Sequence, residues 1–153
     1  MKISLVLNIV LVSLLFLEVG CKGKNEDSGT AEIEGTWKVI SFEDYANDSV
    51  IYKTNDNTWT QYNQGDNTIS FVLNASTNGG LSGVNVTNTF SGDFLIDEAG
   101  HIYITNVEWT KINEPYWAAL MRNIEDAESF EIEDGILIIF YNAGQNSITL
   151  EKA

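Results

Sequence analysis

The sequence predicts a mainly β domain with one helix (α+β), and three observations support this class. Apolar residues recur at short spacing from Ile33 onward. Gly, Asn and Asp interrupt them roughly every eight to twelve residues, which is the rhythm of short strands in an all-β sandwich or barrel. The chain has 153 residues, of which 44% are hydrophobic and 11% aromatic, so it can bury the core of one domain.

Apolar and polar residues alternate most clearly at Ile69, Phe71 and Leu73, which predicts a strand with one buried and one solvated face. Asp134-Gly135 supplies the positive φ of a tight hairpin turn, and residues 142–145 close the next pair. The last three strands are therefore expected to form a meander. We expect strands over residues 35–43, 68–74, 89–97, 101–107, 129–133, 136–141 and 147–152.

Five apolar or aromatic residues recur at helical spacing in the second half of the chain, which predicts a short amphipathic helix. They are Tyr116, Trp117, Leu120, Met121 and Ile124. Asn113 is expected to cap this helix, and Glu114 and Pro115 suit its first turn. Trp117 and Met121 share one stripe, and we expect them to pack into the sheet rather than to form a ligand site.

In two segments the apolar residues follow neither a helical nor a strand period. Residues 45–66 are rich in Asn, Asp and Thr, which is consistent with either an extra hairpin or a long loop. Their clusters at 55–57 and 65–67 leave a weak calcium site open, although no twelve-residue loop with a terminal Glu is present. Residues 78–83 contain glycines but no Lys-Ser or Lys-Thr of a phosphate loop, so we expect a flexible connection there.

The start of the chain has the form of a secretory signal. Lys2 precedes an apolar run over residues 3–17, which is short for a transmembrane helix of about 20 residues. A retained membrane anchor is the alternative. We expect a signal peptide over residues 1–20, a flexible polar tether over 21–32 and a β domain over 33–153.

Gly20-Cys21 resembles a bacterial lipobox, with Glu18 in place of the usual aliphatic residue. The resemblance implies that Cys21 is acylated with fatty acids such as palmitate and becomes the N-terminus of a lipoprotein. Two or three acyl chains hold a protein to a bilayer essentially permanently. We therefore expect lipidation at Cys21 and a place in the bacterial cell envelope, at the outer membrane, facing either the periplasm or the outside.

Charge and composition exclude several kinds of partner and cofactor. The chain has 8 Lys and Arg against 22 Asp and Glu, a formal net charge of -14. Nucleic acid is excluded as a partner because binding to its phosphates needs clustered basic residues. One Cys and one His cannot build a zinc site or an intrachain disulfide. We expect no cofactor and a monomer.

The order of several short motifs is similar to that of the META domain (heat-shock HslJ-like) family of bacterial envelope lipoproteins. The resemblance covers residues 33–152 and implies a small, incompletely closed antiparallel β-barrel with one amphipathic helix packed against it. The motifs are Gly35-Thr36-Trp37-Lys38, Ile69-Ser70-Phe71, Leu81-Ser82-Gly83-Val84-Asn85, Gly92-Asp93-Phe94, a Glu-led helix over 114–121 and Asp134-Gly135-Ile136-Leu137.

The most distinctive of these motifs contains Ser82, Gly83 and Asn85, to which we assign structural roles. Gly83 is expected to allow a positive φ or a close backbone approach. Asn85 can bond its own backbone in a turn. Many family members have Cys where this chain has Val84, so the role of that cysteine does not carry over.

Catalytic motifs are not found. No Gly-x-Ser-x-Gly elbow is present, and the single histidine, His101, is expected at the surface. The acidic residues at 125–134 are expected to form a solvated face, because they surround a helix end and alternate along a strand. The chain is therefore predicted not to be an enzyme.

The sequence favours a non-enzymatic envelope lipoprotein that binds a partner protein or an apolar ligand, in the envelope or in stress response. The candidate partner-binding residues are Trp59, Tyr62 and Trp117, because aromatic side chains anchor interfaces. The alternative is a lipocalin-like carrier of a lipophilic small molecule, since Gly35-Thr36-Trp37 also resembles the opening of that group. Asp48-Ser49-Val50 resembles a short O-glycosylation sequon of Bacteroidetes envelope proteins.

Overall fold

The computed structural model describes residues 31–153, which form one nine-stranded antiparallel sheet and one helical segment. The strands are β1 (Gly35–Asp44), β2 (Ser49–Tyr52), β3 (Asn67–Ala75), β4 (Asn78–Asn85), β5 (Asn88–Ile96), β6 (Ile102–Trp109), β7 (Ala127–Glu133), β8 (Ile136–Tyr141) and β9 (Asn146–Lys152). One turn of 3-10 helix, η1 (Asn63–Gly65), lies just before β3. All seven predicted strands are present, with ends within two residues of those expected.

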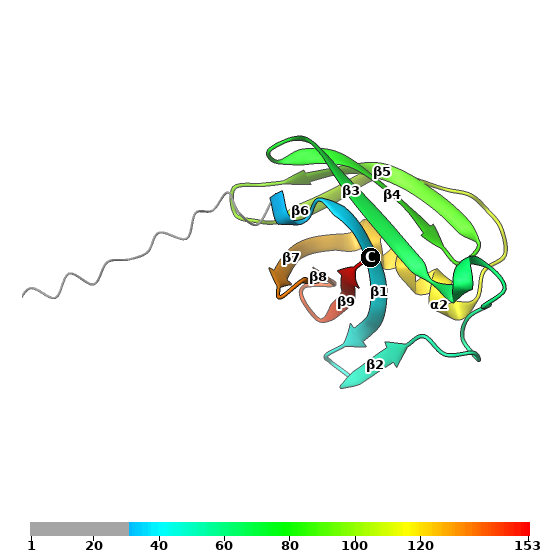
Figure 1. Cartoon of the computed structure of the whole chain (residues 1–153). Helices are drawn as coiled ribbons and strands as arrows, with labels where there is room; N and C mark the ends of the chain where they lie inside the picture. Colours follow the sequence, from blue (N-terminus) through cyan, green and yellow to red (C-terminus); the bar gives the residue numbers. More distant parts are fainter. Residues whose placement is uncertain (1–30) are drawn as a thin grey trace, which may run out of the picture.

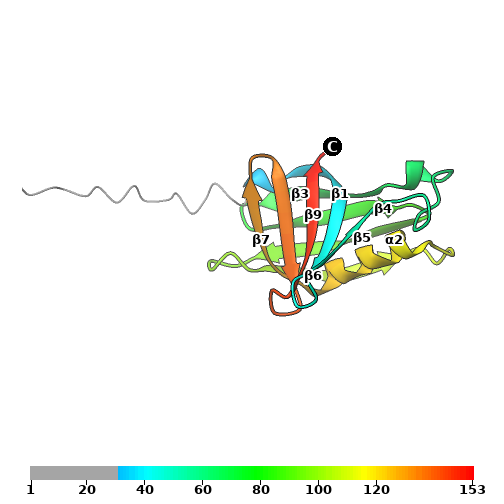
Figure 2. The ribbon, with the colours of Figure 1, turned by 90° about the horizontal axis from the view of Figure 1, so that it is seen from below.

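The sheet curls into a barrel that does not close. Its strand order is β6-β5-β4-β3-β1-β9-β8-β7, and β2 pairs with β1 outside this path. The edge strands β6 and β7 approach each other, but only one bridge, between His101 and Ser129, joins the two sides. Figures 1 and 2 show β7, β8 and β9 running across the long strands β3, β4 and β5 rather than along them. The predicted incompletely closed barrel with one helix is confirmed.

The helical segment fills part of the opening. It begins as α2 (Tyr116–Ala119), continues as the 3-10 helix η2 (Leu120–Asp126), and packs against β6 and β8. Trp117, Met121 and Ile124 are fully buried, as their spacing predicts. The expected cap at Asn113 is wrong, because Pro115 occupies the N-cap position and no side chain caps the helix.

The barrel interior is filled with side chains. Twelve large residues are fully buried, and the edges of two aromatic rings meet the faces of two others. The ring centroids of Phe42 and Trp117 lie 4.9 Å apart, and those of Phe71 and Phe94 lie 5.3 Å apart. The twelve residues are Trp37, Trp117, Phe71, Ile33, Ile69, Ile102, Met121, Ile124, Leu137, Ile139, Ile148 and Leu150.

Two strands, β2 and β4, lie outside the seven predicted ones. Residues 78–83 belong to β4, so the expected flexible connection is wrong. Gly79 and Gly83 face Phe94 and Phe90 of β5 in the antiparallel register, and those rings cover the space that side chains on β4 would fill. Between residues 45 and 66 the open choice is resolved as a hairpin, because β2 pairs with the end of β1.

Candidate functional site

One hollow lies at the open mouth of the barrel, and we call it the mouth groove. It has a volume of about 420 Å³. Ser49, Asp44, Asn146 and Tyr141 pair across β2, β1, β9 and β8 and form one row of the groove. The residues that line it are Phe42, Glu43, Asp44, Ser49, Ile51, Tyr116, Leu120, Asn123, Tyr141 and Asn146.

The helical segment supplies the opposite wall with Tyr116, Leu120 and Asn123. Tyr116 is 58% exposed at the start of α2. Asn123 Nδ2 donates to the Tyr141 hydroxyl oxygen at 3.0 Å. Burial raises the pKa of Tyr141 above its ordinary value of 10.0, while the Asn123 hydrogen bond opposes the rise. The Tyr141 hydroxyl is therefore protonated at neutral pH, and its hydrogen can be donated to a ligand.

Two carboxylates line the mouth groove, and both accept hydrogen bonds within the protein. Asp44 Oδ1 accepts from the backbone N–H groups of Ala46 and Asn47, and its Oδ2 accepts from Asn47 Nδ2. Glu43 Oε1 accepts from the hydroxyls of Ser41 and Thr149. Among residues 31–153, no Lys or Arg lines the groove. Its open polar groups are therefore hydroxyls, an amide oxygen and the carboxylate oxygen Glu43 Oε2.

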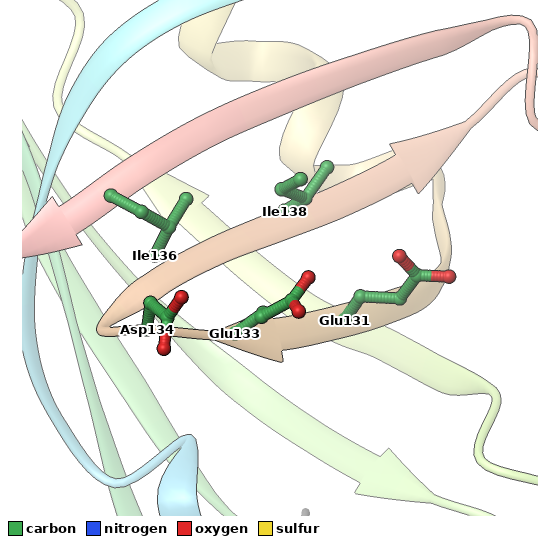
Figure 3. A pocket seen from close by; sticks show the side chains of 5 residues that line it. All are labelled: Glu131, Glu133, Asp134, Ile136 and Ile138. Atoms are coloured by element: carbon green, nitrogen blue, oxygen red, sulfur yellow. The ribbon is translucent and has the colours of Figure 1, made fainter.

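A second hollow lies on the outer face of the β7–β8 hairpin, and its volume is about 260 Å³ (Figure 3). Glu131 pairs with Ile138 and Glu133 pairs with Ile136, so carboxylates stand beside an apolar strip. Asp134 lines the same hollow and, like both glutamates, is exposed. The predicted solvated acidic face is confirmed here.

A row of three fully buried asparagines ties the helical segment to the sheet. Asn67, Asn85 and Asn88 pair across β3, β4 and β5 at one end of the barrel. Asn67 Nδ2 donates to the Trp117 carbonyl and Asn85 Nδ2 donates to the Ala118 carbonyl, both at 3.0 Å. Asparagine side chains on the sheet thereby bind these two helix carbonyls.

The motif residues Ser82, Gly83 and Asn85 have structural places in this part of the molecule. Asn85 Oδ1 accepts from the Asn88 backbone N–H at 3.1 Å, which is the turn bond expected of it. Gly83 has no positive φ, but a Cβ there would lie 2.3 Å from the Thr68 carbonyl oxygen. Glycine is thus required at position 83 because the backbones of β3 and β4 approach closely there. Ser82 is exposed on the other face of β4.

Glu114 extends the asparagine row to the surface. Its Oε2 accepts from Asn85 at 3.0 Å and from Asn88 at 2.8 Å, and its Oε1 accepts from Arg122 Nε at 2.7 Å. Burial acts to raise the pKa of Glu114, but these three hydrogen bonds outweigh it and hold the pKa below its ordinary value of 4.5. The arrangement favours the charged carboxylate.

Replacing Glu114 with Gln is expected to lower the free energy of unfolding by about 2 kcal/mol at pH 7, because hydrogen bonds to a charged group are lost. The pKa is lower in the folded state, so this stabilisation is complete above the unfolded pKa and disappears as pH falls through the folded pKa. Urea unfolding at pH 7 and at pH 3 measures the difference. Glu98→Gln, at an exposed turn, is the control, and an equal loss at both pH values would contradict the prediction.

The aromatic residues predicted to bind a partner do not gather in one site. Trp117 is fully buried and packs into the sheet, as its stripe predicts, so its ring is not available to a partner. Trp59 packs partly against the core, and its ring centroid lies 6.3 Å from that of Tyr62. Tyr62 is 51% exposed, but neither it nor Trp59 lines either hollow.

His101 is exposed, as expected, and pairs with Asp97 in the β5–β6 turn. His101 Nδ1 lies 3.0 Å from Asp97 Oδ2, and the Tyr103 hydroxyl donates to the same oxygen at 3.1 Å. The backbone N–H of His101 is the main cause of an Asp97 pKa of about 2, against an ordinary 3.8. These contacts hold the turn in shape.

Some predicted features lie outside the described residues. They are Cys21, the signal peptide over residues 1–20 and most of the tether over 21–32. Within residues 31–153, no helix has the length and apolar character needed to cross a bilayer. In the same part of the chain, no three His, Cys, Asp or Glu side chains converge as metal ligands. At the proposed calcium clusters, the Asp66 carboxylate pairs with Lys53 and the Asn67 side chain is buried.

A lipocalin-like carrier needs a cavity inside its barrel. Both hollows described above are lined by residues at the mouth or on the outer face, whereas Trp37, Phe71 and Trp117 occupy the interior. The described residues therefore give the carrier alternative no support.

Comparison with known proteins shows a likeness in fold. No protein-family model and no curated protein sequence matches the chain. Among solved structures, it is similar to a DUF4847 family protein from Bacteroides vulgatus ATCC 8482. The TM-score is 0.53 at 16% sequence identity, over 79% of this chain and 94% of that chain. At this identity the likeness shows the fold alone, and the resemblance to the META family stays a prediction.

Proposed function

We propose that this protein is a non-enzymatic, lipid-anchored binding module of the bacterial cell envelope, with the mouth groove as its binding site. The observation that carries the proposal is a groove with two tyrosines and a side-chain amide on a barrel whose interior is packed. Ligand sites commonly combine an apolar floor with a few placed polar groups in a concave surface of this size. A role in envelope stress response follows from the META resemblance.

The groups around the groove support binding rather than catalysis. General acid or base work needs a titratable group that can reach the reacting atoms. Here three hydrogen bonds hold the Asp44 carboxylate, and two hold Glu43 Oε1. The only histidine, His101, does not line the groove. Reproducible conversion of a bound compound by the purified protein would overturn this part of the proposal.

The lipid anchor is tested at Cys21. Cys21→Ala is expected to move the protein from the membrane pellet to the soluble envelope fraction and to abolish its labelling with palmitate, because the thiol is the attachment point. Cell fractionation and labelled palmitate measure both effects. Gly23→Ala is the matched control and should stay membrane-bound and labelled. A Cys21→Ala protein that still pellets with membranes would show that the anchor lies elsewhere.

A further inference from the structure

The polar groups that remain open in the mouth groove define the ligand it can take. Asn146 is already used in part, because its Nδ2 donates to the Glu43 carbonyl and its Oδ1 accepts from Asn142. The Tyr141 hydroxyl accepts from Asn123 and keeps its own hydrogen free. The Tyr116 and Ser49 hydroxyls and Asn123 Oδ1 have no hydrogen-bond partner within residues 31–153.

These open groups offer both donors and acceptors, and the carboxylate oxygen Glu43 Oε2 is a further open acceptor. They surround an apolar floor of Phe42, Ile51 and Leu120. An anionic ligand would meet no cation here and would approach a chain of net charge -14. The Asp44 carboxylate accepts three hydrogen bonds within the protein, whereas Glu43 Oε2 has no partner within residues 31–153 and can accept from a ligand hydroxyl. Charge therefore disfavours an anionic ligand.

A neutral ligand that satisfies this groove needs several hydroxyls arranged around an apolar face. A pyranose ring has this chemistry, because its C–H face packs against an aromatic ring while its hydroxyls donate and accept hydrogen bonds. Tyr116 is exposed on one wall and Tyr141 ends the polar row on the other. A tyrosine presents an apolar ring with a polar tip, which suits both kinds of contact.

We propose that the mouth groove binds a neutral saccharide. Tyr116 supplies the stacking surface, and Tyr141 and Asn123 bind ring hydroxyls. This inference rests on the proposed function and adds its ligand class. An apolar peptide segment would satisfy the floor of the groove but would leave its open polar groups with fewer partners.

The test uses the full chain, purified from the membrane fraction in mild detergent, on an array of neutral oligosaccharides, acidic oligosaccharides and peptides. We expect retention by neutral oligosaccharides. In calorimetric titration with the best of them, Tyr116→Ala and Tyr141→Phe should each weaken binding by about tenfold. The matched control is Tyr52→Ala, which removes an exposed tyrosine that pairs with Ser41 rather than lining the groove. Thermal unfolding establishes that each variant is folded.

Three results would overturn the inference. They are no retention by neutral oligosaccharides, retention by acidic ones alone, and neutral binding that neither groove variant weakens. Retention of peptides that is lost in Tyr116→Ala would replace the saccharide by a protein partner and leave the binding function intact. Cleavage of the bound oligosaccharide would instead overturn the non-enzymatic function while leaving saccharide recognition in place.

Discussion

Gly83→Ala is expected to lower the free energy of unfolding by more than about 3 kcal/mol, at the upper end of what overpacking costs. The added Cβ would lie 2.3 Å from the Thr68 carbonyl oxygen and 2.4 Å from the Phe90 ring. The first of these atoms belongs to the backbone of β3, which is paired with β4 on both sides of the contact. Relief would therefore require the sheet itself to shift.

Gly80→Ala is the matched control for this prediction. Gly80 lies on the same strand, and a Cβ there would meet only the Gly92 carbonyl oxygen at 3.9 Å. We expect unchanged or slightly higher stability, because alanine restricts the unfolded chain more than glycine does. Urea unfolding of both variants measures the contrast. Equal effects would show that Gly83 is not needed for close packing of β4 on β3 and β5.

Trp117→Ala is expected to cost about 3–5 kcal/mol, because it removes a large, fully buried side chain and leaves a cavity in the barrel. The ring packs edge-on against Phe42, and the Trp117 backbone carbonyl accepts from Asn67. The loss should appear as a lower midpoint in thermal and urea unfolding and as greater exposure of the core to dyes.

Two further variants show whether the effect arises from packing. Tyr116→Ala, one residue earlier and 58% exposed, should change stability by no more than about 0.5 kcal/mol. Trp117→Phe should cost less than Trp117→Ala, since it keeps most of the ring and removes an indole N–H that is buried without a partner in the described chain. A surface role for Trp117 would be indicated if the alanine variant were as stable as the parent.

The candidate site was only partly accessible to prediction. Tyr116 and Asn123 fall in or beside the predicted helix and Tyr141 ends a predicted strand, yet no local pattern indicates that they face one another. The sequence instead favoured Trp59 and Tyr62 as binding residues, because they are aromatic residues in an irregular polar segment. A row that crosses β2, β1, β9 and β8 depends on the register between strands that are far apart in sequence.

The sequence alone determined the mainly β class, the seven alternating strands, the Asp134-Gly135 turn and the buried helical stripe. Each of these depends on the side chains of its own segment, where periods of two and 3.6 are visible. Only the tertiary structure shows that residues 78–85 form the strand β4 and that the mouth groove exists. Gly79 and Gly83 have no side chains to reveal a buried face, because Phe94 and Phe90 from the next strand provide that surface. The groove exists because the curled sheet brings the ends of four strands opposite one helix, and a linear pattern does not contain that arrangement.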